Sequence, residues 1–150
     1  METGQKLKAL NFLLDDNKII SCDDLFGKKL IIYFYPKDDT PGCTKEAQDF
    51  NSLNKKFNKL NVRIIGISKD SIEKHVKFKK KYNLSINLVS DEDLKICKAF
   101  KVWIEKSMYG RKYMGIERST FLFDEKLVLI KTWRNVKVKN HAQEVLDFIS

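Results

Sequence analysis

Two nearly continuous apolar runs constrain the fold of this chain more than any other feature of its sequence. They read "KKLIIYFYP" over residues 28–36 and "VRIIGIS" over residues 62–68. Such runs, rich in β-branched and aromatic residues, are typical of strands that are covered on both faces. A segment with helical apolar spacing follows each run. The order predicts β-α-β-α, in which crossover helices join parallel strands.

Apolar spacing of three or four residues defines the two predicted helices. The first presents Ala47, Phe50, Leu53, Phe57 and Leu60 on one face. The second presents Ile72, Val76, Phe78 and Tyr82. Both patterns predict amphipathic helices that pack against the sheet.

The remaining elements complete an α/β pattern. We expect an N-terminal hairpin over 10–21, a short helix from about Asp91 to Phe100 with Ser90 as N-cap, a loop over 105–117, strands within 118–124 and 127–133, and a final helix over 140–150. This is the order of a thioredoxin-like fold, with a central mixed sheet flanked by helices and an N-terminal β-hairpin extension. Because no linker or repeat divides the chain, residues 1–150 are predicted to form a single domain.

Net charge alone gives weak evidence about partners. The formal charge is +9, but only four of the 29 basic residues are arginines, at positions 63, 111, 118 and 134. Base recognition favours arginine, and the lysines are spread along the chain. The densest basic stretch, "KFKKKY", is typical of the solvated face of a helix. A nucleic-acid binder therefore stays only a third hypothesis, and we expect no specific nucleic-acid partner.

Cysteine usage and hydropathy indicate the compartment. The start of the chain lacks the pattern of a signal peptide, and no apolar run approaches the ~20 residues that span a bilayer. We therefore predict a cytoplasmic protein without membrane association. Three cysteines, an odd number, fit a disulfide framework poorly. They form no zinc-type spacing, and His75 and His141 each stand alone, so no metal site is expected.

The stretch "PKDDTPGCTKEAQ" places Cys43 at the start of the first predicted helix. Thr40 is a suitable N-cap, and Pro41 suits the first helical position. Cys43 then lies in the first turn, where free backbone N–H groups and the helix dipole favour a thiolate. Gly42 allows close approach to the sulfur. These features describe a reactive thiolate.

Other functions of Cys43 are open at this level. A buried cytosolic cysteine is commonly a small hydrophobic residue of the core. Disulfide-exchange enzymes use C-x-x-C, whereas Glu46 holds the fourth position here. A cysteine hydrolase needs a histidine base, and neither histidine lies in a recognisable context for that role. The residues themselves therefore indicate a lone thiolate activated by the dipole and by positive charge.

Three segments resemble the peroxiredoxins, and specifically their bacterioferritin comigratory protein or PrxQ subfamily. "FYPKDDTPGCTKEAQDF" contains P-x-x-x-T-x-x-C as Pro36, Thr40 and Cys43. "GIERSTFLFD" and "WRNVKVKNHAQEVL" are similar to later segments of that subfamily and follow in the same order. The resemblance extends from about Lys8 to the C-terminus, and its motifs demand several residues at fixed spacing.

The resemblance implies a thiol-dependent peroxidase that reduces hydrogen peroxide and organic hydroperoxides. Cys43 matches the peroxidatic nucleophile, which becomes a sulfenic acid. Arg118 matches the active-site arginine, Thr40 the residue that donates its hydroxyl to the peroxide, and Pro36 the residue that shields the pocket. Glu46 fits the C-T-x-E pattern and is expected to position the loop, with a surface glutamate as the alternative. No cofactor is implied, since iron, haem and flavin have no signature in the chain.

The chain departs from the subfamily pattern at the resolving cysteine. Gln48 occupies the position five residues after Cys43, where many relatives carry cysteine, and "SIEKHVKFKKKY" lacks one as well. Cys97 is a possible resolving residue, although its apolar neighbours favour a core position; Cys22 has a weaker case. We therefore expect a one-cysteine cycle with an external thiol reductant, namely thioredoxin, glutaredoxin or glutathione. Relatives suggest a monomer. The alternatives are a peroxide sensor on the same fold and a two-cysteine cycle through Cys97.

Overall fold

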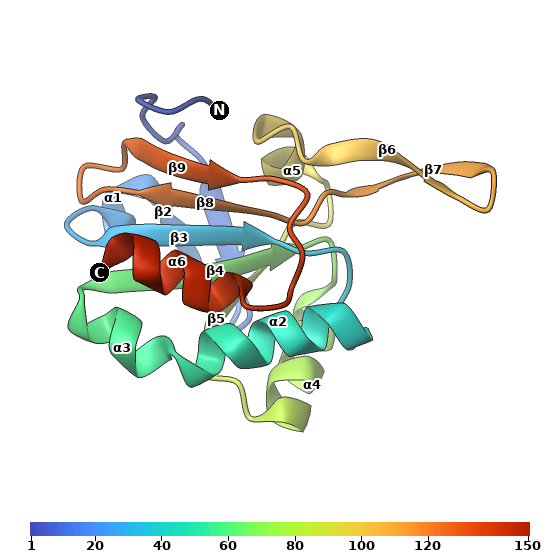
Figure 1. Ribbon diagram of the computed structural model, residues 1–150, viewed down its shortest axis with the longest axis horizontal. Coiled ribbons are helices and arrows are strands. Elements are labelled where there is room, and N and C mark those ends of the chain that lie inside the picture. Colours follow the sequence, from blue (N-terminus) through green and yellow to red (C-terminus); the bar gives the residue numbers. More distant parts are fainter.

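The computed structural model describes residues 1–150 and contains a seven-stranded mixed sheet in the order β2-β1-β5-β4-β3-β8-β9 (Figure 1). The parallel centre consists of β3 (Lys29–Phe34), β4 (Val62–Ser68) and β5 (Asn87–Ser90). Antiparallel strands flank it on both sides, β8 (Ser119–Phe123) and β9 (Leu129–Trp133) beyond β3, and β1 (Asn11–Leu14) and β2 (Ile19–Ser21) beyond β5. The apolar runs of β3 and β4 thus form the centre of the sheet.

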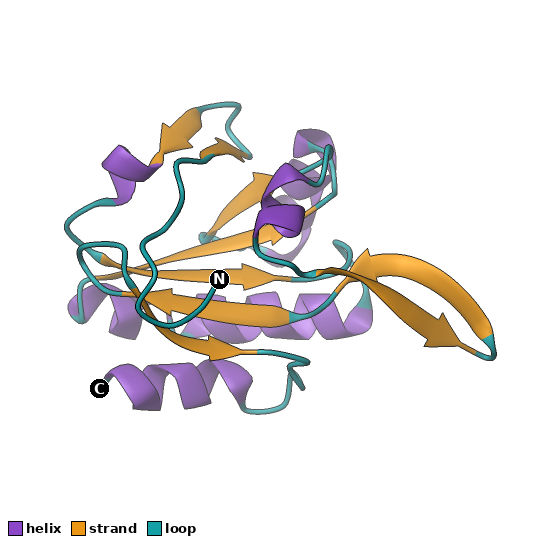
Figure 2. Ribbon diagram, turned by 90° about the horizontal axis from the view of Figure 1, so that it is seen from above, coloured by secondary structure: helices purple, strands orange, loops and turns teal.

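Helices cover both faces of the sheet (Figures 1 and 2). One face carries α2 (Pro41–Ser52), α3 (Asn54–Lys59), α4 (Ile72–Tyr82) and α6 (His141–Ile149). The other carries α1 (Cys22–Leu25) and α5 (Lys95–Ala99). None of these helices combines the length and the apolar character needed to cross a membrane.

Two separate apolar cores result, one on each face. The side chains of a strand alternate between faces, so Tyr33 of β3 joins the core beneath α2, while its neighbours Ile32 and Phe34 join the core beneath α5. The α2 core contains 17 buried residues and the α5 core contains 19. The two cores are similar in size, so the sheet is a middle layer with apolar packing on both of its faces.

The predicted fold class is confirmed, because a central mixed sheet flanked by helices is present. The parallel pairing of β3 with β4 is also as predicted, with Ile31 opposite Ile64. The N-terminal hairpin forms from β1 and β2, and the Leu14 N–H donates to the Lys18 carbonyl across its turn at 2.8 Å. The sequence pattern therefore predicted the order of these elements correctly.

The first predicted helix is divided in two. It ends at Ser52, and α3 begins at Asn54. Leu53 lies between them as the C-cap of α2 and the N-cap of α3. Phe57 remains buried, so the apolar face continues across the break, whereas Leu60 is exposed. The apolar spacing thus predicted the shared core but not the break between α2 and α3.

The inward face of α4 differs from the predicted one. Val76 is 46% exposed, whereas His75 is fully buried. The Ser71 hydroxyl caps this helix by accepting the Lys74 N–H. Hydrophobic spacing missed His75 because its burial depends on hydrogen bonds to distant residues and not on apolar character.

Two further predictions were wrong, and the first of them concerns Ser90. Ser90 ends strand β5 and does not cap the following helix, which begins at Lys95 after the N-cap Leu94. Asp91 still accepts backbone N–H groups of that helix, those of Ile96 and Cys97, at 3.0 and 2.8 Å.

The segment expected to be a loop over 105–117 instead belongs largely to a hairpin of β6 (Trp103–Met108) and β7 (Arg111–Ile116). Its tip residues Tyr109 and Gly110 both have positive φ, which favours a tight two-residue turn. Because most side chains of both strands are not buried, the segment lacks the apolar alternation that marks a packed strand.

Gly66 provides a test of the packing beneath α2. A Cβ atom at this position would lie 2.7–2.9 Å from three atoms of the Tyr33 side chain, which stacks on Phe50 with ring centroids 4.7 Å apart. We expect Gly66→Ala to lower the free energy of unfolding by about 1–3 kcal/mol through overpacking, measured by urea denaturation. In a Tyr33→Leu background the same change should cost less than about 1 kcal/mol. Equal costs in both backgrounds would contradict this account.

Candidate active site

The loop from β3 to α2 places Cys43 in the first turn of α2. Pro41 is the first residue of the helix, and Thr40 is its N-cap in an extended conformation. The Thr40 hydroxyl does not cap the helix; it donates to the Lys37 carbonyl at 2.9 Å. The Thr40 side chain therefore leaves the N–H groups of the first turn uncapped. Cys43 itself is only 2% exposed.

Arg118 reaches Cys43 from the neighbouring strand. Its position follows from the sheet, because the first residue of β8, Ser119, pairs with Phe34 at the end of β3. The Nη2 atom of Arg118 donates to the Cys43 Sγ at 3.4 Å. A Cβ atom at position 42 would lie 3.2 Å from Nη2, so Gly42 leaves room for the guanidinium. A cation therefore lies directly against the sulfur.

Glu46 shares the same guanidinium. Its Oε1 accepts from Nη1 of Arg118 at 2.6 Å, and the residue is 1% exposed. Burial raises the pKa of Glu46 to about 7, and Arg118 opposes that rise. The other oxygen, Oε2, has no protein partner. Arg118 thus links a buried carboxyl group to the sulfur.

Tyr33 lies beneath this group on β3. Its hydroxyl is buried without a partner. Burial raises the pKa of Tyr33 well above its ordinary value, and the nearby Glu46 and Cys43 raise it further. The phenol therefore stays neutral and supplies a buried O–H dipole beside the sulfur and the carboxyl group.

A buried polar network fixes the loop that precedes the cysteine. The two carboxyl oxygens of Asp38 meet the Tyr35 hydroxyl at 2.5 Å and Nδ1 of His75 at 2.6 Å. The Asp38 backbone N–H donates to Asp70, whose Oδ2 also accepts from the Ser68 hydroxyl. The loop carrying Pro36 and Thr40 is therefore held from α4 and from the end of β4.

His75 is held through both of its ring nitrogens. Its Nε2 lies 3.1 Å from the Val89 carbonyl, which can only accept, so Nε2 carries a hydrogen. Its Nδ1 lies 2.6 Å from Oδ2 of Asp38. Asp38, Asp70 and His75 bring three potential metal-ligand atoms within 4.8 Å of one another. Because protein donors and acceptors already occupy both Asp38 oxygens and both ring nitrogens, we interpret the cluster as a positioning network.

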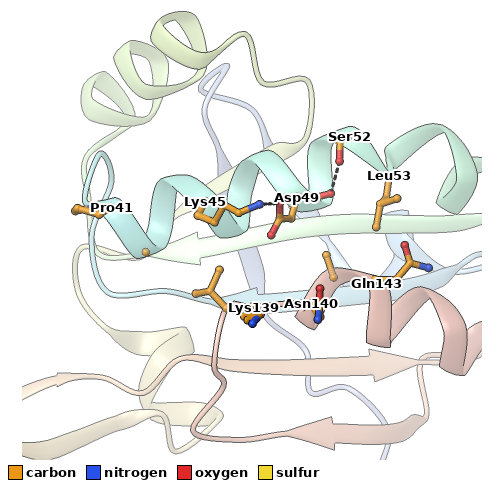
Figure 3. A pocket seen from close by; sticks show the side chains of 11 residues that line it. Pro41, Lys45, Asp49, Ser52, Leu53, Lys139, Asn140 and Gln143 are labelled. Carbon is orange, nitrogen blue, oxygen red and sulfur yellow. Dashed lines mark hydrogen bonds and ion pairs between the residues drawn. The ribbon is translucent and has the colours of Figure 1, made fainter.

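A groove between α2 and α6 opens next to the first turn of α2 (Figure 3). Its volume is about 510 Å³, and Pro41 and Gly42 line one end. Lys45 and Asp49 form an ion pair at 2.5 Å along its α2 side, and Lys139 lines the opposite wall. The groove thus brings solvent to the backbone beside Cys43, although Cys43 is not among its lining residues.

Comparison with known proteins decides the family. The AhpC/TSA family profile matches residues 3–132. Peroxiredoxin Bcp of Bacillus subtilis is 50% identical over 147 residues, which are 98% of this chain and 94% of that protein. The chain belongs to the AhpC/TSA family as a peroxiredoxin of the Bcp/PrxQ type. It is therefore a thiol-dependent peroxidase.

Solved structures agree with this peroxiredoxin in fold. A PrxQ mutant of Xylella fastidiosa has a TM-score of 0.94 at 39% identity and covers 99% of this chain and 95% of its own. The bacterioferritin comigratory protein of Xanthomonas campestris, whose structure concerns its alkyl peroxide reduction activity, has a TM-score of 0.89 at 44% identity, with 93% and 89% covered. Both neighbours match nearly the whole chain.

The peroxiredoxin fold brings together most of the residues singled out from the sequence. Arg118 and Glu46 meet beside Cys43. Pro36 and Thr40 lie in the same loop and are both partly buried. Cys97 does not join them: it is fully buried in the α5 core, on the other face of the sheet from Cys43.

Sequence reasoning missed the residues that support this site. Tyr33 was assigned to a buried strand without a polar function, and Asp38, Asp70 and His75 were not connected. The acidic pair after Lys37 and the lone histidine were the available signals, but their pairing depends on the contact between the loop and α4. Only the tertiary structure shows that contact.

Glu46 predicts a pH dependence of stability. Since its folded-state pKa is raised above the ordinary value, the folded protein holds this proton more tightly than the unfolded chain. The wild type should therefore lose stability relative to Glu46→Gln as the pH rises from 5 to 8, by about 1–3 kcal/mol. Urea unfolding of both proteins at both pH values measures this. A difference that does not change with pH would refute the assignment.

Proposed function

We propose that the Cys43 thiolate is the peroxidatic nucleophile of this peroxidase. The contact of the Arg118 guanidinium with the Cys43 sulfur is the observation that carries the proposal. The thiolate attacks one peroxide oxygen, an S–O bond forms and the O–O bond breaks. Cys43 becomes a sulfenic acid, and the leaving hydroxide or alkoxide takes up a proton to give water or an alcohol. Substrates are hydrogen peroxide and organic hydroperoxides.

Arg118 and Thr40 stabilise this step. The guanidinium donates where negative charge moves from sulfur to the leaving oxygen, and such donors are worth about 10²–10³-fold in rate. The Thr40 hydroxyl, which meets the Lys37 carbonyl in the free protein, donates to the bound peroxide. Pro36 shapes the loop and limits access of water. Glu46 orients Arg118 through its bond to Nη1.

An external thiol completes the cycle in this proposal. Cys97 is fully buried on the opposite side of the sheet, and burial and Asp91 raise its thiol pKa strongly, so it is a poor nucleophile. Cys22 packs at the α5 side and its Sγ lies 2.9 Å from the Lys8 carbonyl. Thioredoxin, glutaredoxin or glutathione therefore attacks the Cys43 sulfenic acid directly. A two-cysteine cycle through Cys97 is the competing scheme.

The setting of the enzyme is part of the same proposal. Three free thiols and a thiol-driven cycle suit the reducing cytoplasm. We propose that residues 1–150 act as a single-domain monomer, with no cofactor and no metal in the reaction. A sensor on the same fold would stop after about one equivalent of peroxide, whereas an enzyme turns over.

Substitution at Cys43 and Arg118 tests the first step. We expect Cys43→Ser to abolish peroxide consumption with excess thiol, and Arg118→Ala to slow it by about 10²–10³-fold. Cys22→Ser is the matched control, because it removes a thiol that lies outside the site, and its rate should equal that of the wild type. Consumption by Cys43→Ser near the wild-type rate would refute the proposed nucleophile.

Intact mass after one equivalent of peroxide tests the resolving step. Without added thiol, the wild type and Cys97→Ser should both carry one added oxygen at Cys43, which a sulfenic-acid reagent traps. An internal disulfide in the wild type that is lost in Cys97→Ser would instead establish the two-cysteine cycle. The same measurement thus separates the two schemes directly.

A further inference from the structure

The β6–β7 hairpin takes no part in the catalytic steps proposed above. It forms a two-stranded sheet of its own, paired with no strand of the main sheet. It projects from the body beyond the end of the sheet at which β3 leads into α2 (Figures 1 and 2). Isolated two-stranded hairpins are marginally stable in water, so an arm of this kind is an unusual element for a packed domain.

One face of the hairpin is both apolar and basic. Register and strand alternation place together Ile104, Lys106, Met108, Arg111, Tyr113 and Gly115, which we name the Lys106 face. Met108 is 56% exposed and Tyr113 is 44% exposed. Methionine, tyrosine and arginine are residue types enriched in protein interfaces, and methionine adapts to irregular partner surfaces.

The hairpin leads directly into the segment that carries Arg118. The hairpin ends at Ile116, two residues before Arg118. Lys106 is near enough to the site for its charge to interact with Arg118 and Cys43: burial and Arg118 lower the pKa of Lys106, and Cys43 opposes this. A Cβ atom at Gly115 would lie 3.2 Å from the Lys106 side chain and 3.4 Å from that of Tyr113, so the glycine lets these two pack together.

The base of the hairpin is firmly held. The Glu117 backbone N–H donates to the Val102 carbonyl at 2.7 Å, which closes the ribbon below its first pair. The Glu117 carboxylate meets Arg134 at 2.8 Å and accepts the Asn135 N–H at 2.9 Å. The arm therefore has a fixed origin beside the site, while its tip, with Tyr109 fully exposed, extends into solvent.

We propose that the Lys106 face is the docking surface for an acidic protein thiol reductant. The Lys106 face carries two cations, Lys106 and Arg111, and no acid. Glu105 lies on the opposite face of the hairpin, where it pairs with Lys112 at 3.7 Å. The whole chain has a net charge of +9. A negatively charged partner is attracted by this arm, whereas a second copy of the chain is repelled. Exposed Met108 and Tyr113 supply the apolar centre that a stable encounter needs.

This inference rests on the proposed one-cysteine cycle, and it names the class of reductant. The partner's thiolate attacks the sulfur of the Cys43 sulfenic acid, an S–S bond forms, the S–O bond breaks, and the leaving hydroxide is protonated to water. A second thiol of the partner then attacks the partner sulfur that is bonded to Cys43 in the mixed disulfide. This step releases the Cys43 thiolate and leaves the partner with an internal disulfide. Electrons and atoms balance with two partner thiols per peroxide.

Charge reversal on the hairpin tests the surface. The test variant is Arg111→Glu combined with Met108→Ser. The matched control is Lys55→Glu, at an exposed residue of α3, which changes the net charge equally. Stopped-flow measurements give three rates for each protein: oxidation by peroxide, reduction of the oxidised protein by a thioredoxin of negative net charge, and reduction by dithiothreitol.

We expect the hairpin variant to react about tenfold or more slowly with the acidic thioredoxin, while its rates with peroxide and dithiothreitol stay within about twofold of the wild type. Lys55→Glu should keep all three rates. The wild-type rate with thioredoxin should fall as salt increases, and that of the hairpin variant should fall less.

Three results would overturn the docking surface: equal losses in the hairpin variant and in Lys55→Glu, an unchanged thioredoxin rate in the hairpin variant, or a wild type that glutathione reduces and thioredoxin does not. Failure of the one-cysteine cycle itself looks different. In that case the oxidised wild type contains an internal disulfide or no oxidised Cys43, whichever hairpin is present.

Discussion

A single guanidinium, shared between a thiol and a buried carboxyl group, is the interaction on which the site depends. Arg118 uses one terminal nitrogen for Cys43 and the other for Glu46. Hydrogen bonds that involve a charged group contribute about 1.5–3 kcal/mol, but their larger effect here is geometric, because two bonds fix the plane of the guanidinium. Sheet order, the loop before α2 and Gly42 all serve this contact: β8 brings the arginine to the end of β3, and the glycine leaves space for it.

The residues around that contact are polar and buried. Tyr33, Glu46, Asp38 and His75 are each almost wholly removed from solvent. Burying such groups is costly unless they are paired, and replacing buried ionic groups by apolar residues of the same volume is often neutral or stabilising. The protein thus gives up stability beneath α2 to hold one loop and one cation in place, a common compromise at catalytic sites.

Much of the fold followed from local patterns in the sequence. The runs of β3 and β4 and the spacing of Phe50 and Phe57 depend on hydrophobicity alone, so they could be recognised without tertiary information. Cys43, Thr40 and Arg118 were singled out because the motifs behind the family resemblance are specific. The burial of His75 could not be predicted, since it depends on contacts with residues far along the chain, and the β6–β7 hairpin could not be predicted, since its ribbon buries little. The break at Leu53 had no signal in the apolar spacing, which continues across it.

The sheet also separates Cys43 from the other two cysteines of the chain. Cys43 belongs to one apolar core, while Cys97 and Cys22 belong to the other side. Under the proposed cycle, no thiol of the same chain shortens the life of the sulfenic acid, so its lifetime is set by the supply of outside thiol. A burst of peroxide that outpaces this supply drives Cys43 on to the sulfinic acid, which most reductants cannot reverse. Because the sheet separates these thiols, the reducing capacity of the cell determines how long the enzyme stays active as well as how fast it works.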